Sequence, residues 1–244
     1  CACIDLSQGC SGYVYGLWIA FMILESSNSR NVLLLAGDTM SHKVNPKDKS
    51  CRPLFGDSGT ATYIVSQPVN HESYFSLNTD GSGYDSIIIP SGGSRQPEKN
   101  KSNLSLSIND SRNPSNLYMD GIKVFNFALK RAPESINDIL SFAHLTIPDI
   151  DYFILHQANK YVIEKICKKA NIPLSKAPSD TVGKYGNQGP SSIPSTICDF
   201  FTQNKIDNDA TILMCGFGVG LSWASAIINM SSLFVLPPTQ YVDE

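Results

Sequence analysis

The chain has 244 residues, of which 42% are hydrophobic, as in an ordinary globular protein. Its formal net charge of −3 argues against a nucleic-acid-binding protein, although a small basic docking patch remains compatible with it. The longest apolar stretch, Val14 to Leu24, is too short to span a bilayer, and no signal peptide is recognisable. Seven cysteines, most of them in apolar surroundings, favour a reducing compartment, and we therefore expect a cytoplasmic protein.

The chain begins with an alternating apolar run, Ala2 to Leu6, which predicts a β-strand. A strand at the first residue, without an initiating Met, suggests a fragment that lacks its N-terminal part. Cys10 follows on a predicted tight turn, and an apolar helix is expected over 13–24. A thiol at a helix start meets unpaired N–H groups and the positive end of the helix dipole, which favour the reactive thiolate. Cys10 is thus a candidate acyl-carrying nucleophile, although cysteines in apolar surroundings are often only small hydrophobic residues.

The rest of the chain predicts alternating strands, helices and loops. The expected strands are 31–38, the part of 54–65 after a glycine-rich turn, 151–155, 211–215 and 222–229. The expected helices are 120–142, 160–170 and 192–201, and Pro133 predicts a kink or a second start in the first of them. Segments 74–77 and 86–89 flank Asp80-Gly81 and predict a hairpin. Residues 41–53, 91–116 and 182–192 are expected to be loops. This alternation predicts an α/β sheet with helices on its faces.

Three residues at the ends of these elements could meet: Cys10, His156 and Asn187. His156 directly follows a predicted strand, and Asn187 lies in the glycine-rich loop. Each has an ordinary structural alternative, since a histidine at a strand end is often a satisfied structural group and an asparagine often forms a turn.

With their surroundings, these residues resemble the 3-oxoacyl-acyl-carrier-protein synthase III family, condensing enzymes of the thiolase superfamily. The resemblance rests on segments 5–12, 54–61, 119–128, His156-Gln157-Ala158-Asn159, Gly186-Asn187 with Ser191-Ser192-Ile193-Pro194, and 216–223. It implies a thiolase-like α/β fold: two similar halves in helix-sheet-helix-sheet-helix layers, the first half incomplete here. It further implies a division into 1–118, 119–230 and a tail at 231–244, and a homodimer.

The resemblance also implies a mechanism. Cys10 would take an acyl group from an acyl-CoA primer, and malonyl-acyl carrier protein would lose CO2 to give an enolate that attacks the acyl-cysteine. His156 and Asn187 would donate hydrogen bonds to the enolate, and the backbone N–H groups of Cys10 and Val219 would hold the oxyanion of the acyl group. The residues expected to contact the CoA and carrier-protein thioesters are His42, Asn159, Gly186, Phe217 and Gly218. No metal or further cofactor is expected.

Three departures from the family pattern affect substrate binding. Tyr161 stands where the family often has an arginine on its carrier-protein docking face, so docking would be altered or would use nearby lysines. These lysines, which are equally explained as a solvated helix face, are Lys160, Lys165, Lys168 and Lys169. Gln188 to Pro190 stand where small residues are usual, which would reshape the pantetheine channel. Val219 replaces a glycine but keeps its N–H group.

Two other functions remain open at this point. The same fold could transfer an acyl group to an amine or hydroxyl acceptor without decarboxylation. Alternatively, the chain could be a non-catalytic subunit that binds carrier protein. The sequence does not indicate the primer length or the pathway, which could be that of a fatty acid, a polyketide or the acyl group of a surface glycan.

Overall fold

The computed structural model describes residues 1–26, 28–66, 72–97, 113–204, 209–230 and 233–242. Its helices are α1 (Gly12–Ser26), α2 (Gly121–Phe142), α3 (Lys160–Lys169), α4 (Thr181–Tyr185) and α5 (Ser192–Gln203). Its 3-10 segments are η1 (Met40–His42), η2 (Gly81–Ser86), η3 (Ile147–Asp149), η4 (Leu174–Lys176) and η5 (Gly189–Ser191). Its strands are β1 (Asn31–Asp38), β2 (Ser58–Val65), β3 (Tyr74–Thr79), β4 (Ile87–Ile88), β5 (Tyr118–Met119), β6 (Tyr152–Leu155), β7 (Thr211–Gly218) and β8 (Ser222–Asn229).

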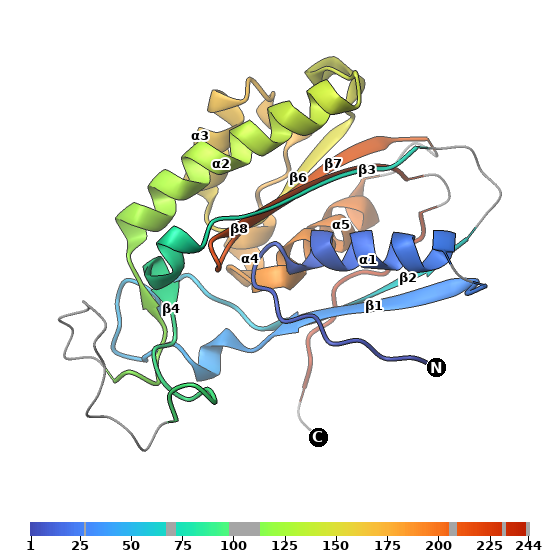
Figure 1. Cartoon of the computed structure of the whole chain (residues 1–244). Coiled ribbons are helices and arrows are strands. Elements are labelled where there is room, and N and C mark those ends of the chain that lie inside the picture. The colour runs from blue at the N-terminus through green and yellow to red at the C-terminus, as the bar shows by residue number, and fades with distance from the viewer. Residues whose placement is uncertain (27, 67–71, 98–112, 205–208, 231–232, 243–244) are drawn as a thin grey trace.

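The elements form alternating layers of helix and sheet (Figure 1). The main sheet has the order β3-β8-β7-β6, with β6 and β7 parallel and the other pairs antiparallel. Helices α2 and α3 cover one face, while α1 and α5 lie between the other face and the antiparallel pair β1-β2. These are four of the five layers that the sequence predicts.

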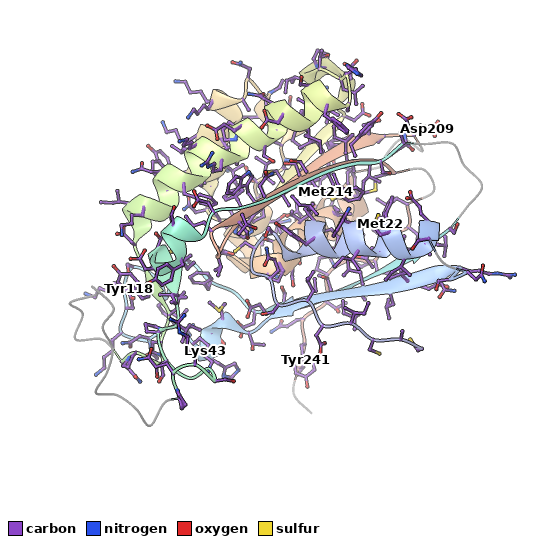
Figure 2. The ribbon with its side chains drawn as sticks, in the orientation of Figure 1. Met22, Lys43, Tyr118, Asp209, Met214 and Tyr241 are labelled. Carbon is purple, nitrogen blue, oxygen red and sulfur yellow. The ribbon has the colours of Figure 1, made fainter. Side chains whose placement is uncertain are left out.

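Two hydrophobic cores hold the layers together. One lies between α2, α3 and the main sheet, and the other lies between that sheet, α1, α5 and the β1-β2 pair. Met214 of β7 belongs to the second core (Figure 2). Because β7 is buried on both faces, its sequence is an unbroken run of apolar and small residues, as is usual for a central strand.

The predicted strand over Ala2 to Leu6 is wrong. Residues 1–8 form no regular element, and the side chains of Ile4 and Leu6 are 67% and 42% exposed. Alternating apolar residues make a stable strand only when a neighbouring strand accepts and donates the backbone hydrogen bonds. Within the described part of the chain, no strand pairs with this segment.

The predicted hairpin at Asp80-Gly81 is also wrong. Strand β3 pairs with β8, and the two-residue strand β4 pairs with β5. The Asp80 side chain accepts a hydrogen bond from the Ser82 N–H at 3.0 Å and so caps the 3-10 segment η2. An aspartate before a glycine indicates a local turn here, but it does not determine which strands pair.

Helix α2 runs through Pro133, so the predicted second start is wrong, while the alternative of a kink stays a prediction. A proline inside a helix cannot donate to the carbonyl four residues earlier, here that of Leu129. The Lys169 ammonium of α3 donates to this Leu129 carbonyl at 2.9 Å. The neighbouring helix thus satisfies the group that Pro133 leaves unbonded.

The outer face of β1-β2 carries large apolar side chains. Leu33, Leu35, Tyr63 and Val65 are between 44% and 68% exposed, whereas the alternate residues face the second core. In the tail, Leu233 and Val235 pack against that core, and the segment that follows is mostly exposed. The division at residue 118 stays a prediction; strand β3, from the first part, is an edge strand of the sheet formed by the second.

Candidate active site

Cys10 lies two residues before α1, in close contact with the end of β7. A Cβ atom built on Gly218 would lie 2.7 Å from the Cys10 sulfur, and one on Gly216 would lie 2.8 Å from the Cys10 carbonyl oxygen. Both distances are too short for real contacts, so only glycine at these two positions lets the Cys10 turn approach the strand. Gly218 therefore lies beside the Cys10 sulfur, while its predicted contact with the substrate thioester stays a prediction.

The Cys10 thiol stays protonated in the resting protein at neutral pH. Burial raises its pKa to about 11, and hydrogen bonds from the backbone of Val219 and of Cys10 itself offset only part of this increase. A helix terminus is worth at most about 2 kcal/mol, or roughly 1.5 pKa units, which is too little to produce a thiolate at pH 7. The helix start alone therefore does not activate Cys10. The same two backbone groups are the predicted oxyanion donors.

His156 follows β6 and is 2% exposed. Its backbone N–H donates to the Cys215 carbonyl at 2.8 Å, and its ring stands edge-to-face with that of Phe217, with 5.3 Å between the ring centroids. Its Nδ1 atom lies 2.6 Å from the Ser192 Oγ atom, while Nε2 has no hydrogen-bond partner among the described residues. Burial lowers the pKa of His156 to about 4, so the ring is neutral at pH 7.

Asn187 is held in place by the segment 54–56. Its N–H donates to the Leu54 carbonyl at 2.7 Å, and its carbonyl accepts from the Gly56 N–H at 3.0 Å. The Asn187 Oδ1 atom accepts from the Gly189 N–H at 3.0 Å. Because Oδ1 is engaged in this way, the Nδ2 group is the part of the side chain that can donate to a substrate.

The strand β7 and the segment 187–192 connect the three residues. Cys10 contacts Gly216 and Gly218, and His156 contacts the intervening Phe217 ring. On the other side, Ser192 joins His156 to the carbonyl of Gly189, to which it donates at 2.7 Å. The structure thus places the Cys10 thiol and the neutral His156 ring against neighbouring residues of β7, and Ser192 and Gly189 link the ring to the loop of Asn187.

The other predicted substrate-binding residues differ in their positions. Phe217 is buried against His156, and Gly186 ends α4 with a φ of 74°, where a Cβ atom would lie 3.0 Å from the Leu54 carbonyl oxygen. The Asn159 Oδ1 atom accepts from the Val162 N–H at 2.9 Å and caps α3, so that oxygen is already engaged. His42 is exposed at the end of η1. A contact of any of these residues with CoA stays a prediction.

Two residues near the site received no individual role from the sequence. Ser192 entered only as part of a motif, although its hydroxyl contacts the His156 ring. Asp38, the last residue of β1, lies so close to Gly189 that a Cβ atom there would be 3.1 Å from its Oδ2 atom. Burial raises the pKa of Asp38, and its charge raises that of Cys10. In the sequence, the only indication of a role for Asp38 is that it is an aspartate at the end of an apolar strand.

Comparison with known proteins identifies the family. The sequence profile of 3-oxoacyl-[acyl-carrier-protein] synthase III matches residues 4–81, and the profile of its C-terminal part matches residues 140–230. A β-ketoacyl-[acyl-carrier-protein] synthase III of Caldanaerobacter subterraneus is 34% identical over 94% of this chain and 67% of its own length. The chain belongs to the 3-oxoacyl-[acyl-carrier-protein] synthase III family.

Other members of the synthase III family agree in sequence and in fold. A putative 3-oxoacyl-[acyl-carrier-protein] synthase 3 of Campylobacter jejuni is 36% identical over 94% of this chain and 64% of its own length. The crystal structure of a 3-oxoacyl-(acyl-carrier protein) synthase of Burkholderia xenovorans superposes with a TM-score of 0.86, at 33% identity, over 96% of this chain and 65% of that one. The thiolase-like fold is thereby confirmed, and the chain spans about two thirds of the length of these relatives.

Three of the four lysines near the predicted synthase III docking face, Lys160, Lys165 and Lys169, have partners of their own. Lys160 pairs with Asp180 at 3.2 Å, and Lys169 bonds the Leu129 carbonyl. The Lys165 ammonium lies 4.9 Å from the centre of the Tyr161 ring, which is stacked on Phe125. Their use in carrier-protein docking stays a prediction.

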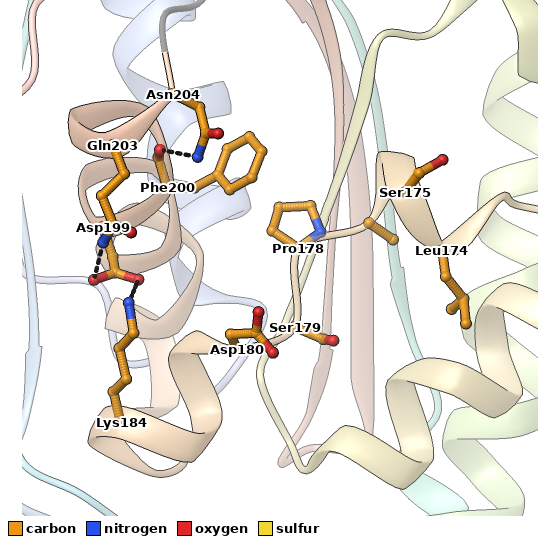
Figure 3. Close-up of a pocket in the computed structure, with 11 residues that line it drawn as sticks. Leu174, Ser175, Pro178, Ser179, Asp180, Lys184, Asp199, Phe200, Gln203 and Asn204 are labelled. Carbon is orange, nitrogen blue, oxygen red and sulfur yellow. Dashed lines mark hydrogen bonds and ion pairs between the residues drawn. The ribbon is translucent and has the colours of Figure 1, made fainter.

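A pocket of about 280 Å³ opens between α5 and the segment 174–180 (Figure 3). Lys184 and Asp199 form an ion pair at its wall, with 2.7 Å between Nζ and Oδ2. None of Cys10, His156 and Asn187 lines it, so it is separate from the candidate site. Across the described ranges, no group of three His, Cys, Asp or Glu residues is arranged to hold a metal ion, and no helix is long and apolar enough to cross a membrane.

Replacing Gly56 with alanine should disturb the clamp that holds Asn187. The added Cβ atom would lie 1.9 Å from the Tyr185 carbonyl oxygen, and neither backbone can move without displacing Asn187. We expect a loss of about 3 kcal/mol in the free energy of unfolding, measured by urea denaturation. Gly59→Ala is the matched control, because a Cβ atom there meets nothing within 4 Å. Equal stability of the two variants would contradict the clamp.

Acid should destabilise the protein through His156. Its pKa is about 4 in the native state and about 6.5 when unfolded, so between these values the unfolded chain binds a proton that the native chain does not. Stability is therefore full above pH 6.5 and falls as the pH drops towards 4, by about 3 kcal/mol. His156→Asn should lose this pH dependence in denaturation curves. His144→Asn, at an exposed site with a φ of 55° that asparagine tolerates, should keep it.

Proposed function

We propose that this chain carries out a decarboxylative Claisen condensation, joining an acyl-CoA primer to malonyl-acyl carrier protein through an acyl-Cys10 intermediate. The observation that carries the proposal is the buried Cys10 thiol with the backbone groups of Val219 and Cys10 directed at its sulfur, at the end of β7 against which His156 also packs. Membership of the synthase III family supports it. Cytoplasmic location and a homodimer are part of the proposal.

In the first half-reaction, the neutral His156 ring accepts the Cys10 proton on Nε2. As this proton leaves, the Cys10 sulfur attacks the carbonyl carbon of the acyl thioester. The backbone N–H groups of Cys10 and Val219 stabilise the resulting oxyanion. CoA leaves as a thiolate and takes the proton back from Nε2, so the ring returns to its neutral state. Proton transfer accompanies the attack because, with a pKa of about 11 for Cys10 and about 4 for His156, neither a free thiolate nor a thiolate–imidazolium pair accumulates at pH 7.

In the second half-reaction, His156 and Asn187 act as donors. The malonyl group loses CO2, and the electrons of the broken C–C bond form an enolate. Nε2–H of His156 and the Nδ2 group of Asn187 hydrogen-bond the enolate oxygen. The enolate carbon attacks the acyl-Cys10 carbonyl, the sulfur leaves as a thiolate and is reprotonated, and the 3-oxoacyl thioester is released.

The test is a reconstituted reaction of the protein with a panel of acyl-CoA primers and malonyl-acyl carrier protein. We expect 3-oxoacyl-acyl carrier protein and CO2 in equal amounts, and the best primer would define the chain length. Product formation without malonyl thioester would favour simple acyl transfer to another acceptor. If no thioester were consumed while labelled carrier protein still bound, the chain would be a carrier-protein-binding subunit.

The pathway is a further part of the proposal. Several relatives are named β-ketoacyl-[acyl-carrier-protein] synthase III, and one similar structure is described as the priming β-ketosynthase of the R1128 polyketide pathway, at 28% identity and a TM-score of 0.78. We therefore place this chain at the priming step of a fatty acid, polyketide or related acyl chain. The primer found in the reconstituted reaction would distinguish among them.

A further inference from the structure

We propose that Ser192 is a positioning residue whose hydroxyl lets the His156 ring carry its proton on Nδ1 in one half-reaction and on Nε2 in the other. This inference rests on the proposed function for its purpose, but its structural basis does not. Ser192 is fully buried at the start of α5, and its Oγ atom lies 2.6 Å from Nδ1 of His156 and 2.7 Å from the Gly189 carbonyl oxygen.

The hydroxyl can make two alternative hydrogen-bond patterns. In the first, Nδ1–H of His156 donates to Oγ, and the Ser192 O–H donates to the Gly189 carbonyl. In the second, the Ser192 O–H turns to donate to a bare Nδ1, and the ring proton sits on Nε2. The Gly189 carbonyl is not orphaned in the second pattern, because it also accepts from the backbone N–H of Ser192. A hydroxyl both donates and accepts, so it serves both tautomers.

A different partner would fix one tautomer. A carboxylate or a carbonyl can only accept, and it would hold the proton on Nδ1 permanently. Within the described part of the chain, the side-chain contacts of the His156 ring are Ser192 and the apolar ring of Phe217, and neither carries a charge. The Gly189 backbone also interacts with the ring and favours a ring N–H. Among the described groups around the ring, the Ser192 hydroxyl is the one that can donate to a bare Nδ1, and it thereby makes the second tautomer accessible.

The two half-reactions need opposite tautomers. Acylation needs a bare Nε2 to accept the Cys10 proton, which requires the ring proton on Nδ1. Condensation needs Nε2–H to donate to the enolate, which leaves Nδ1 bare in the neutral ring. The ring is neutral in both starting states because it is buried. Exchange of one proton with water, on one nitrogen and off the other, converts the first state into the second.

Ser192→Ala should separate the two half-reactions. The variant has no hydroxyl left to donate to a bare Nδ1, whereas the Gly189 backbone, whose hydrogen bond raises the pKa of His156, remains beside the ring, so we expect the first tautomer to prevail. We expect acylation of Cys10 by acyl-CoA, followed by intact mass, to change by less than about 3-fold, and condensation to fall roughly 10–100-fold. Ser192→Thr, which keeps the hydroxyl, should restore condensation. Ser191→Ala is the matched control, since that neighbouring hydroxyl bonds the Ala36 carbonyl and not the ring.

The tautomers can also be observed without turnover. Nitrogen-15 NMR of ring-labelled histidine should show both forms of His156 in the unmodified protein and only the Nδ1–H form in Ser192→Ala, with His156→Asn assigning the signals. Equal loss of both half-reactions, with an unchanged tautomer ratio, would overturn the proposal, and so would a single tautomer in the unmodified protein. If the unmodified protein fails to condense, the proposed function fails, while the NMR comparison still decides the role of Ser192.

Discussion

Cys10→Ala should abolish the covalent acyl adduct that the unmodified protein forms with acyl-CoA, and with it all condensation. Alanine removes the only sulfur that lies beside the backbone groups of Val219 and Cys10. The change in packing is small, because the substitution removes only the buried sulfur atom and with it the close approach to Gly218. Intact mass spectrometry should show one added acyl group in the unmodified protein and none in the variant, at a similar unfolding temperature.

The matched control for this experiment is Cys198→Ala. Cys198 is a partly buried thiol on α5 whose pKa burial also raises, but it lies outside the site. This variant should acquire the acyl group as the unmodified protein does. An adduct that survives in Cys10→Ala and disappears in Cys198→Ala would show that another thiol carries the acyl group, and the proposed mechanism would lose its first step.

Asn187→Asp should leave acylation intact and slow condensation by roughly 10²–10³-fold, the usual effect of removing one oxyanion donor. The aspartate keeps an oxygen that can accept from the Gly189 N–H, so the loop contact survives. It replaces the Nδ2 donor with an acceptor, and at pH 8 its ionised form would repel the enolate. The measurement compares single-turnover rates of the two half-reactions in the same preparation.

A control for Asn187→Asp is the same substitution at Asn204, which is exposed at the end of α5 and bonds only the Phe200 carbonyl there. Both half-reactions should proceed normally in Asn204→Asp. If Asn187→Asp slowed acylation as much as condensation, Asn187 would position the nucleophile or the primer and would not stabilise the enolate.

Much of the layered fold can be predicted from the sequence because its buried elements carry strong local patterns. The apolar runs at 31–38 and 211–215 predict strands that the structure confirms, and the helical spacing at 160–170 predicts α3. The three candidate residues were recognisable because Cys10 precedes an apolar helix, His156 follows a strand and Asn187 lies in a glycine-rich loop. The structure places Cys10 and His156 against β7 and links His156 to the Asn187 loop through Ser192, although their chemical roles still await the experiments above.

Other features depend on residues far apart in the chain. The partner of β3 is β8, nearly 150 positions later, and no turn signal near Asp80 indicates that pairing. Continuity of α2 through Pro133 depends on Lys169 of another helix. The pKa of Cys10 depends on how completely the surrounding layers exclude water, which the helix start alone does not reveal.

The two glycines of β7 that face Cys10 have a consequence for protein engineering. Because any side chain at position 216 or 218 would collide with the nucleophile turn, this wall of the site offers no room for reshaping. An effort to change the range of accepted primers would have to leave that strand untouched. It would begin instead at positions such as Gln188, which is buried directly after Asn187 and stands where the resemblance to the family implies a smaller residue.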